Sequence, residues 1–300
     1  MADDRDARLR AAAFDHLHQL EQRHPDGALR SADINHFTFE GQPQRLIVQT
    51  GIWKPSGLDA ALSIRTTYTR PDQLPPYEDD LGLDGYVRYK YRGADPNHSD
   101  NRALREALAT GTPLIYFVGI ASGVYSALYP VWIVGEDRSR LEFTVAVDEA
   151  QRPAGTVDLV WPDKAYAIRL TQQRLHQPVF RTRVLRAYND TCAICRLRHA
   201  ELLDAAHILP DSHARGIPVV PNGLALCKIH HAAYDRNIVG IRPDLIVEIQ
   251  PGVLAEVDGP MLRHGLQEMA GTEIAIPRAR DAQPDPDRLQ ERYTEFLAAG

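Results

Sequence analysis

The sequence predicts an α+β protein with two domains, a β-rich one at residues 1–160 and a second one at residues 161–300. The chain has 300 residues, a length that suggests two domains or one large one. Short segments rich in β-branched and aromatic residues follow one another from about residue 30 to 150. Beyond them, helical periodicity returns together with cysteines and histidines at the spacing of metal ligands.

The first domain is expected to begin with a helix at about residues 5–23, where apolar residues recur at helical spacing. Six segments then read as strands: 45–55, 62–69, 85–93, 113–120, 125–135 and 141–148. One helix interrupts them in "DNRALREALATG", with Asp100 or Asn101 as its N-cap and Gly111 just past its end. This order predicts a curved sheet or a small barrel.

A last strand and a linker are expected at 154–165, before residues 166–191 return to helical spacing with a break at Pro178. Further strands are expected at 238–249 and 271–277, and Asp285 or Asp287 is expected to open a C-terminal helix. The helical segment carries five arginines and little acid: Arg169, Arg174, Arg181, Arg183 and Arg186. A solvated helix face would explain them. Their place directly before a metal-ligand motif favours phosphate contact, which we predict for the last three.

Composition restricts the function classes. The formal charge of −6 means that a nucleic-acid partner must meet a local basic patch. Three cysteines cannot form a paired disulfide framework, so we expect free thiols or metal thiolates in a reducing compartment. The charged N-terminus lacks the apolar core of a signal peptide, and no apolar run approaches the roughly 20 residues of a membrane span. A cytoplasmic protein is expected.

All three cysteines belong to two half-sites, Cys192-x-x-Cys195 and Cys227-x-x-His230. A two-residue gap lets both side chains of a pair face one ion, and four sulfur and nitrogen ligands complete a tetrahedral zinc shell. Small buried hydrophobes would be the alternative explanation for the cysteines. The matched spacing favours a structural Zn²⁺ site.

A second metal site is predicted beside the first. On a helix expected to begin near residues 222–226, His231 and Asp235 lie at i and i+4 on one face, turned away from the zinc. A histidine and a carboxylate suit a hard divalent ion, Mg²⁺ or Mn²⁺, that keeps open water positions. Upstream, "LLDAAHIL" reads as a strand that ends near His207. A ββα arrangement that joins strand, loop and helix suits phosphodiester hydrolysis, with His207 as base and Asn222 holding the loop or the ring.

The run "CAIC…DAAHILP…VVPNGLALCKIHHAAYD" resembles the zinc-knuckle subgroup of the HNH (ββα-metal) nucleases, as in McrA-type restriction enzymes, over about residues 180–240. The resemblance makes His207 the general base, Asn222 the orienting residue and His231 a metal ligand. Many HNH enzymes place an acid or a second histidine directly before the base, where this chain has Ala206. Asp235 and Asp204 are the candidates for the missing ligand, with Asp235 preferred for its helical register.

The β-rich domain resembles SRA/PUA-like modules that recognise modified DNA, over about residues 45–148, although it lacks their fuller glycine-rich signature. More loosely, it resembles the sulfur-binding domains of phosphorothioate-dependent restriction enzymes, with Tyr129-Pro130 as the pair that lines the sulfur cup. An ordinary barrel surface would also carry such residues. The predicted DNA contacts of this domain are Tyr91, Arg92, His98, Asn101, Arg102, Tyr129 and Pro130.

These features lead to the hypothesis of a modification-dependent, type IV-like restriction endonuclease. Between the two kinds of substrate, we favour phosphorothioate DNA over 5-methylcytosine or 5-hydroxymethylcytosine DNA, and we expect a homodimer. Two other classes stay open. Ala206 favours a non-catalytic zinc-knuckle DNA-binding protein. The third class is an HNH toxin or general defence nuclease whose N-terminal half binds a protein.

Overall fold

The computed structural model describes residues 2–73, 84–152 and 164–299. The chain divides into an N-terminal unit, residues 1–69 with 75–179, and a C-terminal unit, residues 70–74 with 180–300. The predicted domain boundary at 160/161 and the predicted strand at 154–165 fall largely on residues outside the described ones. In the described part of the chain, no helix is long and apolar enough to cross a membrane.

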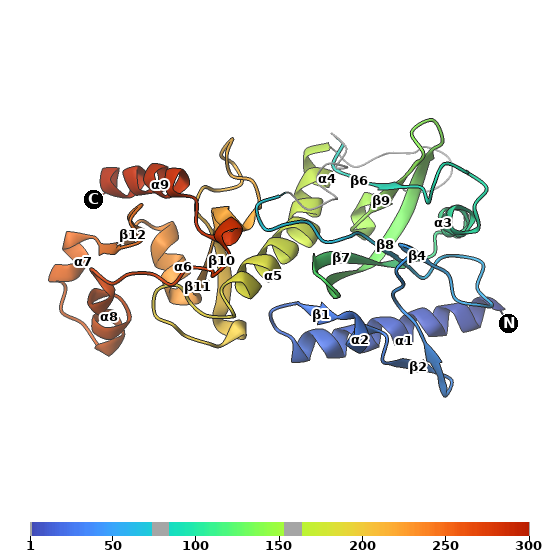
Figure 1. Cartoon of the computed structure of the whole chain (residues 1–300), viewed down its shortest axis with the longest axis horizontal. Helices are drawn as coiled ribbons and strands as arrows, with labels where there is room; N and C mark the ends of the chain where they lie inside the picture. Colours follow the sequence, from blue (N-terminus) through green and yellow to red (C-terminus); the bar gives the residue numbers. More distant parts are fainter. Residues whose placement is uncertain (1, 74–83, 153–163, 300) are drawn as a thin grey trace. The chain divides into compact units, whose positions relative to one another are not determined.

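The N-terminal unit is a sheet covered on one face by a long helix, α1 (Ala2–Arg23) (Figure 1). The helix buries Leu9, Ala13 and Leu17, one turn apart, against the sheet. Small elements follow α1 in the chain: β1 (Leu29–Arg30), α2 (Ser31–Ile34), and the hairpin of β2 (Phe37–Phe39) and β3 (Gln42–Gln44). The predicted helix at 5–23 is therefore confirmed and begins a few residues earlier.

The sheet has the strand order β4-β5-β7-β8-β9-β6, with β1 paired to the start of β8. Its bounds are β4 Ile52–Trp53, β5 Ser63–Arg65, β6 Val87–Lys90, β7 Leu114–Ala121, β8 Val124–Asp137 and β9 Glu142–Ala146. All six predicted segments contain a strand, although the segment at 45–55 contributes only two residues. β8 is long enough to change partner along its length, from β7 up to Val131 to β9 from Trp132 onward.

The sheet curls so far that a side chain of β6, at one end of the strand order, hydrogen-bonds backbone groups near the other end. Tyr89 on β6 places its hydroxyl 3.1 Å from the carbonyl oxygens of both Gly51 and Arg65, which flank β4 and β5 at the other end of the strand order. β6 does not pair with β4 in the described residues. The structure thus shows a curled sheet, the first of the two predicted alternatives, and does not confirm the PUA/SRA-like barrel.

Strand β7 is buried on both faces, because helices cover both sides of the sheet. Ile115 and Phe117 face the core beneath α1, and Tyr116 and Val118 face the core that holds α3 (Ser99–Thr110). The N-cap of α3 is His98, whose ring accepts from the Asp100 backbone, rather than the predicted Asp100 or Asn101. Gly111 ends the helix in the left-handed conformation, as expected.

Helical structure resumes with α4 (Lys164–Thr171) and continues through a π-helical turn (Gln172–His176) into α5 (Gln177–Ala187). The predicted interruption near Pro178 takes the form of this π-helical turn, which ends two residues before the proline. A proline inside a helix donates no hydrogen bond to the carbonyl four residues earlier and crowds it, and that residue, Arg174, lies in the π-helical turn.

The C-terminal unit is built on a ββα arrangement. β10 (Leu203–His207) pairs with β11 (Gly223–Cys227) antiparallel, and α6 (Lys228–Asp235) follows without a loop. The helix expected to begin near residues 222–226 begins at Lys228 instead, because residues 223–227 satisfy their backbone groups on β10.

The remaining elements of this unit enclose its core. They are β12 Val239–Ile241, β13 Val247–Ile249, α7 Pro251–Ala255, α8 Pro260–Gly265 and α9 Pro286–Ala298. Single 3₁₀ turns lie at Glu149–Gln151, Ala200–Leu202, Val220–Asn222, Gln267–Met269 and Arg280–Ala282, the first in the N-terminal unit. Residues 238–249 form the hairpin of β12 and β13, and Asp285 caps α9, as predicted. The strand expected at 271–277 is reduced to one bridge between Ile246 and Glu273.

Candidate functional site

The structure brings the three cysteines and His230 together. The ligand atoms of Cys192, Cys195, Cys227 and His230 all lie within 4.8 Å of one another. Cys192 Sγ lies 3.6 Å and Cys227 Sγ 3.1 Å from His230 Nδ1, and Cys195 Sγ lies 4.0 Å from Cys227 Sγ. Tetrahedral zinc with its usual bond lengths separates neighbouring sulfur and nitrogen ligands by about 3.5–3.8 Å. The donor set and its spacing therefore fit one zinc ion.

The local fold fixes these four ligands. Cys192 and Cys195 lie on a tight turn that Cys192 closes by donating its N–H to the Leu197 carbonyl, 2.9 Å away. Cys227 ends β11 and is the N-cap of α6, so His230 stands in the first turn of the helix. His230 Nε2 lies 2.8 Å from the Gly265 carbonyl, a contact that assigns the proton to Nε2 and leaves Nδ1 free to bind metal.

A second centre lies on the same unit, in a cavity of about 430 Å³. Its wall includes His207 from the end of β10 and His231 from α6, so the ββα arrangement presents both histidines to one space. The residues that line it are His207, Ile208, Pro210, Asp211, His231, Asp235, Asn237, Arg292 and Glu295. A cavity with two imidazoles and three carboxylates can hold a divalent cation and a proton acceptor side by side.

His207 is held by its surroundings on two sides. Its ring stacks on Phe180, with the ring centroids 4.1 Å apart and the planes 15° from parallel. Nε2 lies 3.0 Å from Asp211 Oδ1, an ion-pair distance, although that nitrogen has no well-aligned hydrogen bond in the described residues. The stacking restrains the ring, and Asp211 places a carboxylate beside its nitrogen.

His231 lies between the two candidate carboxylates. Its Nε2 is 3.3 Å from Asp235 Oδ2, and its Nδ1 is 3.8 Å from Asp204 Oδ2. Asp204 also binds Lys228 at 2.9 Å and lies 3.5 Å from Arg181. Burial favours a raised pKa for Asp204, but Lys228, His231 and Arg181 outweigh it and lower the pKa below its usual range. Asp235 lines the cavity and Asp204 does not.

Asn222 holds the loop between β10 and β11. It is completely buried. Its Oδ1 accepts from the Leu209 backbone at 2.9 Å, and its Nδ2 lies 3.0 Å from the Leu209 carbonyl and 3.1 Å from that of Ile217. Of the two roles considered from the sequence, the contacts match the one that holds the loop. The same loop carries Asp211 into the cavity.

Comparison with known proteins locates a family in this region. The model of the HNH endonuclease family (HNH_2) matches residues 192–242. The C-terminal unit contains an HNH endonuclease domain. No curated protein matches the chain. Among solved structures, a "Modification dependent TagI restriction endonuclease" is similar at 16% identity and a TM-score of 0.31, over 83% of this chain and 86% of that one. A likeness at that TM-score carries no argument about function.

Four polar residues that line the cavity of His207 and His231 were not predicted: Asp211, Asn237, Arg292 and Glu295. A signal existed for Asp211, an acidic residue four positions after His207 in the loop that follows the strand. The others depend on tertiary packing. Arg292 reaches across from α9, donates to the Tyr234 carbonyl at 2.6 Å and hydrogen-bonds Asn237, so nothing near it in the sequence marks it.

The three predicted arginine contacts on α5 differ in their surroundings. Arg183 is buried and donates to the carbonyl of Arg70 at 2.6 Å and that of Gln73 at 3.0 Å, which fastens residues 70–73 to the C-terminal unit. Arg181 donates to two backbone carbonyls at 2.9 Å. Arg186 is exposed. Of these three, Arg186 has the surroundings that a phosphate contact requires.

Most of the predicted DNA contacts near α3 bind other residues of the helix or of the loop before it. Asn101 is completely buried, and its amide binds the backbone of Arg92 and of Asp95. Arg92 pairs with Asp100, and His98 caps the helix, while Arg102 is exposed. Asn101 therefore stabilises the loop instead of presenting its amide to a ligand.

Tyr91 and Tyr129 are also engaged within the unit. Tyr91 is 7% exposed, stacks on Phe143 and hydrogen-bonds Glu136. Tyr129, which precedes the half-buried Pro130, stacks on Phe14 at 5.3 Å, and its hydroxyl donates to Glu21 at 2.8 Å. Contacts within the unit therefore account for the positions of both aromatic rings, and no sulfur ligand is needed to explain them.

Proposed function

We propose that this protein is a metal-dependent endodeoxyribonuclease whose HNH domain cleaves double-stranded DNA. The observation that carries the proposal is the cavity shared by His207 and His231 on β10 and α6, within a stretch that matches the HNH endonuclease family. Hydrolysis of a phosphodiester needs a base for the water and positive charge for the phosphate. The cavity contains an imidazole that can act as the base and a histidine–carboxylate pair that could hold a divalent cation.

His207 is the proposed base. An imidazole takes up a proton near neutral pH, so it can remove one from water as the water attacks phosphorus. The stack on Phe180 holds the ring in one orientation, which lowers the cost of reaching a reactive geometry. Asp211, 3.0 Å from Nε2, is placed to stabilise the imidazolium once it has formed.

His231 and Asp235 are the proposed ligands of a divalent ion such as Mg²⁺ or Mn²⁺. Their side chains line the cavity one helical turn apart, 3.3 Å from each other. A bound divalent ion supplies positive charge to the phosphoryl and leaving oxygens. The Cys₃His cluster is proposed to hold Zn²⁺ in a structural role, because its four donors complete a tetrahedral shell with no position for substrate.

Position 206, where many HNH nucleases have an additional ligand, contains a fully buried alanine. Ala206 packs in the core of the C-terminal unit, so its backbone position directs a side chain away from the cavity. Ala206 is thus compatible with a working site in which Asp235 supplies the carboxylate. This weakens the reading of a non-catalytic zinc-knuckle DNA-binding protein.

Recognition of modified DNA is proposed for the N-terminal unit. A separate unit ahead of the HNH domain is a suitable place for specificity. No contact of Tyr129 favours phosphorothioate over a modified base, so the proposal leaves the modification open. A cytoplasmic location and a homodimer stay predictions.

The test is cleavage of supercoiled plasmid with Mg²⁺ or Mn²⁺, using unmodified, 5-methylcytosine, 5-hydroxymethylcytosine and phosphorothioate DNA. His207→Ala should abolish nicking but keep the wild-type fold and DNA affinity. His199→Ala, an exposed histidine of the same unit, is the control and should cut normally. Normal cutting by His207→Ala would remove the base assignment. DNA binding by wild-type protein without product in either ion would favour the non-catalytic reading, and equal cutting of all four plasmids would remove modification dependence.

A further inference from the structure

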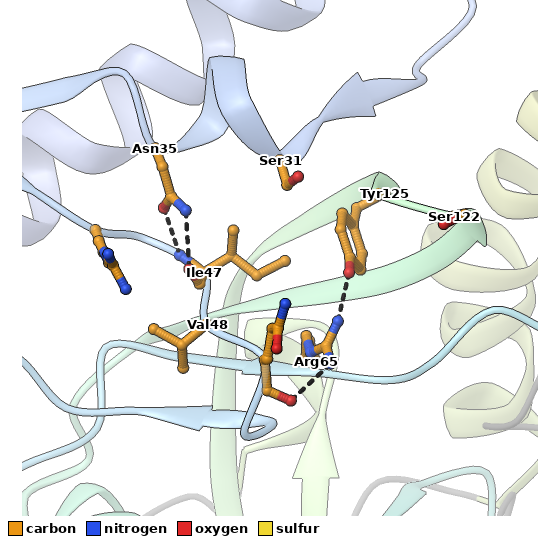
Figure 2. Close-up of a pocket in the computed structure, with 10 residues that line it drawn as sticks. Ser31, Asn35, Ile47, Val48, Arg65, Ser122 and Tyr125 are labelled. Carbon is orange, nitrogen blue, oxygen red and sulfur yellow. Dashed lines mark hydrogen bonds between the residues drawn. The ribbon is translucent and has the colours of Figure 1, made fainter.

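The N-terminal unit has an open cavity of about 640 Å³ that none of the predicted DNA contacts lines. It lies where the segment after β3 passes the β7–β8 turn and the start of α2 (Figure 2). Its lining residues are Ser31, Asn35, Arg45, Ile47, Val48, Gln49, Arg65, Ser122, Gly123 and Tyr125. The size is within the range of small-ligand sites, about 300–1,000 Å³.

Arg65 on β5 is fixed within this cavity. It donates through Nη2 to the Gln49 carbonyl at 2.7 Å and through Nη1 to the Tyr125 hydroxyl (Figure 2). Two of the five N–H groups of the guanidinium are used in this way, and Nε is buried without a partner in the described residues. The remaining N–H groups on the two Nη atoms stay available to a ligand, on a side chain that loses little freedom when it binds.

The charge of the cavity is unbalanced. None of its ten lining residues is acidic, and two of them are arginines. Neither Arg45 nor Arg65 forms an ion pair with a described residue, whereas Arg88, Arg105 and Arg174 of the same unit pair with carboxylates. Holding a partly buried guanidinium without a counter-charge costs free energy, which an anion would recover.

The walls match a phosphate ester in other respects. Asn35 accepts from the backbone of Leu46 and Ile47 and donates to the Ile47 carbonyl, so its bonds hold that segment in place. Hydroxyl groups of Ser31 and Ser122 add donors, and Ile47 and Val48 add an apolar side suited to a sugar. The rim residues Arg45 and Gln49 are exposed, so the cavity is open enough for a strand that continues past it.

We propose that this cavity binds a backbone phosphate of the DNA, with Arg65 as its main contact and Arg45 at the rim. The inference rests on the proposed DNA-cleaving function but assigns a binding site in the other unit. Phosphate contacts position a protein on DNA without reading its sequence. The cavity would then fix where the strand crosses the N-terminal unit.

The experiment measures DNA affinity of the full-length His207→Ala protein, which should not cut, at several salt concentrations. Loss of one phosphate contact reduces the slope of log affinity against log salt by about 1. Arg65→Gln should show this change and lose at least about tenfold in affinity, the value of one charged hydrogen bond. Arg65→Lys should keep the slope. Arg23→Gln, which removes an exposed charge of the same unit that does not line the cavity, should match the parent protein.

Arg45→Gln is a second variant that should spare the fold, because the exposed Arg45 side chain forms no hydrogen bond or ion pair with a described residue. It should reduce the slope in the same direction. Unchanged slopes for both arginine variants would overturn the proposal, as would a parent protein that does not bind DNA. A thermal shift with deoxynucleoside monophosphate that Arg65→Gln removes, alongside an unchanged DNA slope, would assign the cavity to a free nucleotide instead. If the wild-type protein binds DNA but cuts none, the proposed nuclease activity is refuted and the proposed phosphate site is not.

Discussion

Replacing Asn222 with alanine tests whether this HNH residue supports structure or chemistry. Its amide makes three hydrogen bonds at 2.9–3.1 Å to backbone groups of Leu209 and Ile217, all inside the C-terminal unit. Each such bond contributes about 1 kcal/mol net, and the deleted amide also leaves buried partners unsatisfied. The free energy of unfolding should fall by about 3 kcal/mol.

In a unit of about 120 residues, that loss lowers the melting temperature by about 10 °C. The assay is thermal unfolding, followed together with plasmid cleavage well below the transition. Asn222→Asp is the matched variant, because it keeps the acceptor for the Leu209 N–H but turns a carboxylate toward the two carbonyls. It should therefore melt no higher than Asn222→Ala at neutral pH.

The refuting result is specific. An Asn222→Ala protein that melts like the wild type and no longer cuts would show that the amide acts on the base or the substrate. A protein with a lower melting temperature that still cuts while folded would assign the amide to the loop. The second result is the expected one.

Three other predictions follow from described contacts. One Zn²⁺ per chain should be found by elemental analysis, and Cys227→Ser should lose the ion and unfold the C-terminal unit, since a closed structural site contributes folding free energy directly. Asp211→Asn should slow cutting by about ten- to a hundredfold at unchanged DNA affinity, as for other residues that orient a catalytic group. A hydrogen bond from Arg105 lowers the pKa of Glu136 to about 2, so its stabilisation is complete above the usual value near 4.5 and is lost as pH falls from there toward 2. Glu136→Gln should flatten the pH dependence of unfolding in that window, and an unchanged curve would contradict the assignment.

Short-range sequence signals predicted the structure correctly where a residue interacts with others close to it in the sequence. Gly111 ended α3 and Asp285 opened α9 as expected, because caps act within a few residues. The segment at 45–55 had the composition of a strand, but Arg45 and residues 47–49 line the phosphate cavity. The backbone of Leu46 and Ile47 is hydrogen-bonded by Asn35 and not by a neighbouring strand. Composition reports β propensity and cannot report which partner is available.

The Cys₃His cluster was predictable because zinc sites require a characteristic ligand spacing, which the sequence shows. Which carboxylate is proposed to join His231 depended on tertiary structure, since Lys228 and Arg181 pair with Asp204 while Asp235 lines the cavity. The predicted DNA contacts of the N-terminal unit also depended on tertiary structure. Polar side chains near a turn suggested DNA contact, yet Asn101 uses its amide to hydrogen-bond the backbone of the loop before α3.

The adjacent pair His230-His231 shows why α6 has to begin at Lys228. Neighbouring helical residues point about 100° apart, so one helix presents the two rings to different surroundings. Cys227 at the N-cap places His230 three residues on, facing the sulfurs at 2% exposure, while His231 is left on the cavity side with Asp235 one turn later. Had the helix begun near residue 222, Cys227 would lie within it and residues 223–227 could not hold β10 in register with His207. The end of β11 therefore positions both groups of side chains at once, which accounts for the proposed closed and open metal sites lying so few residues apart.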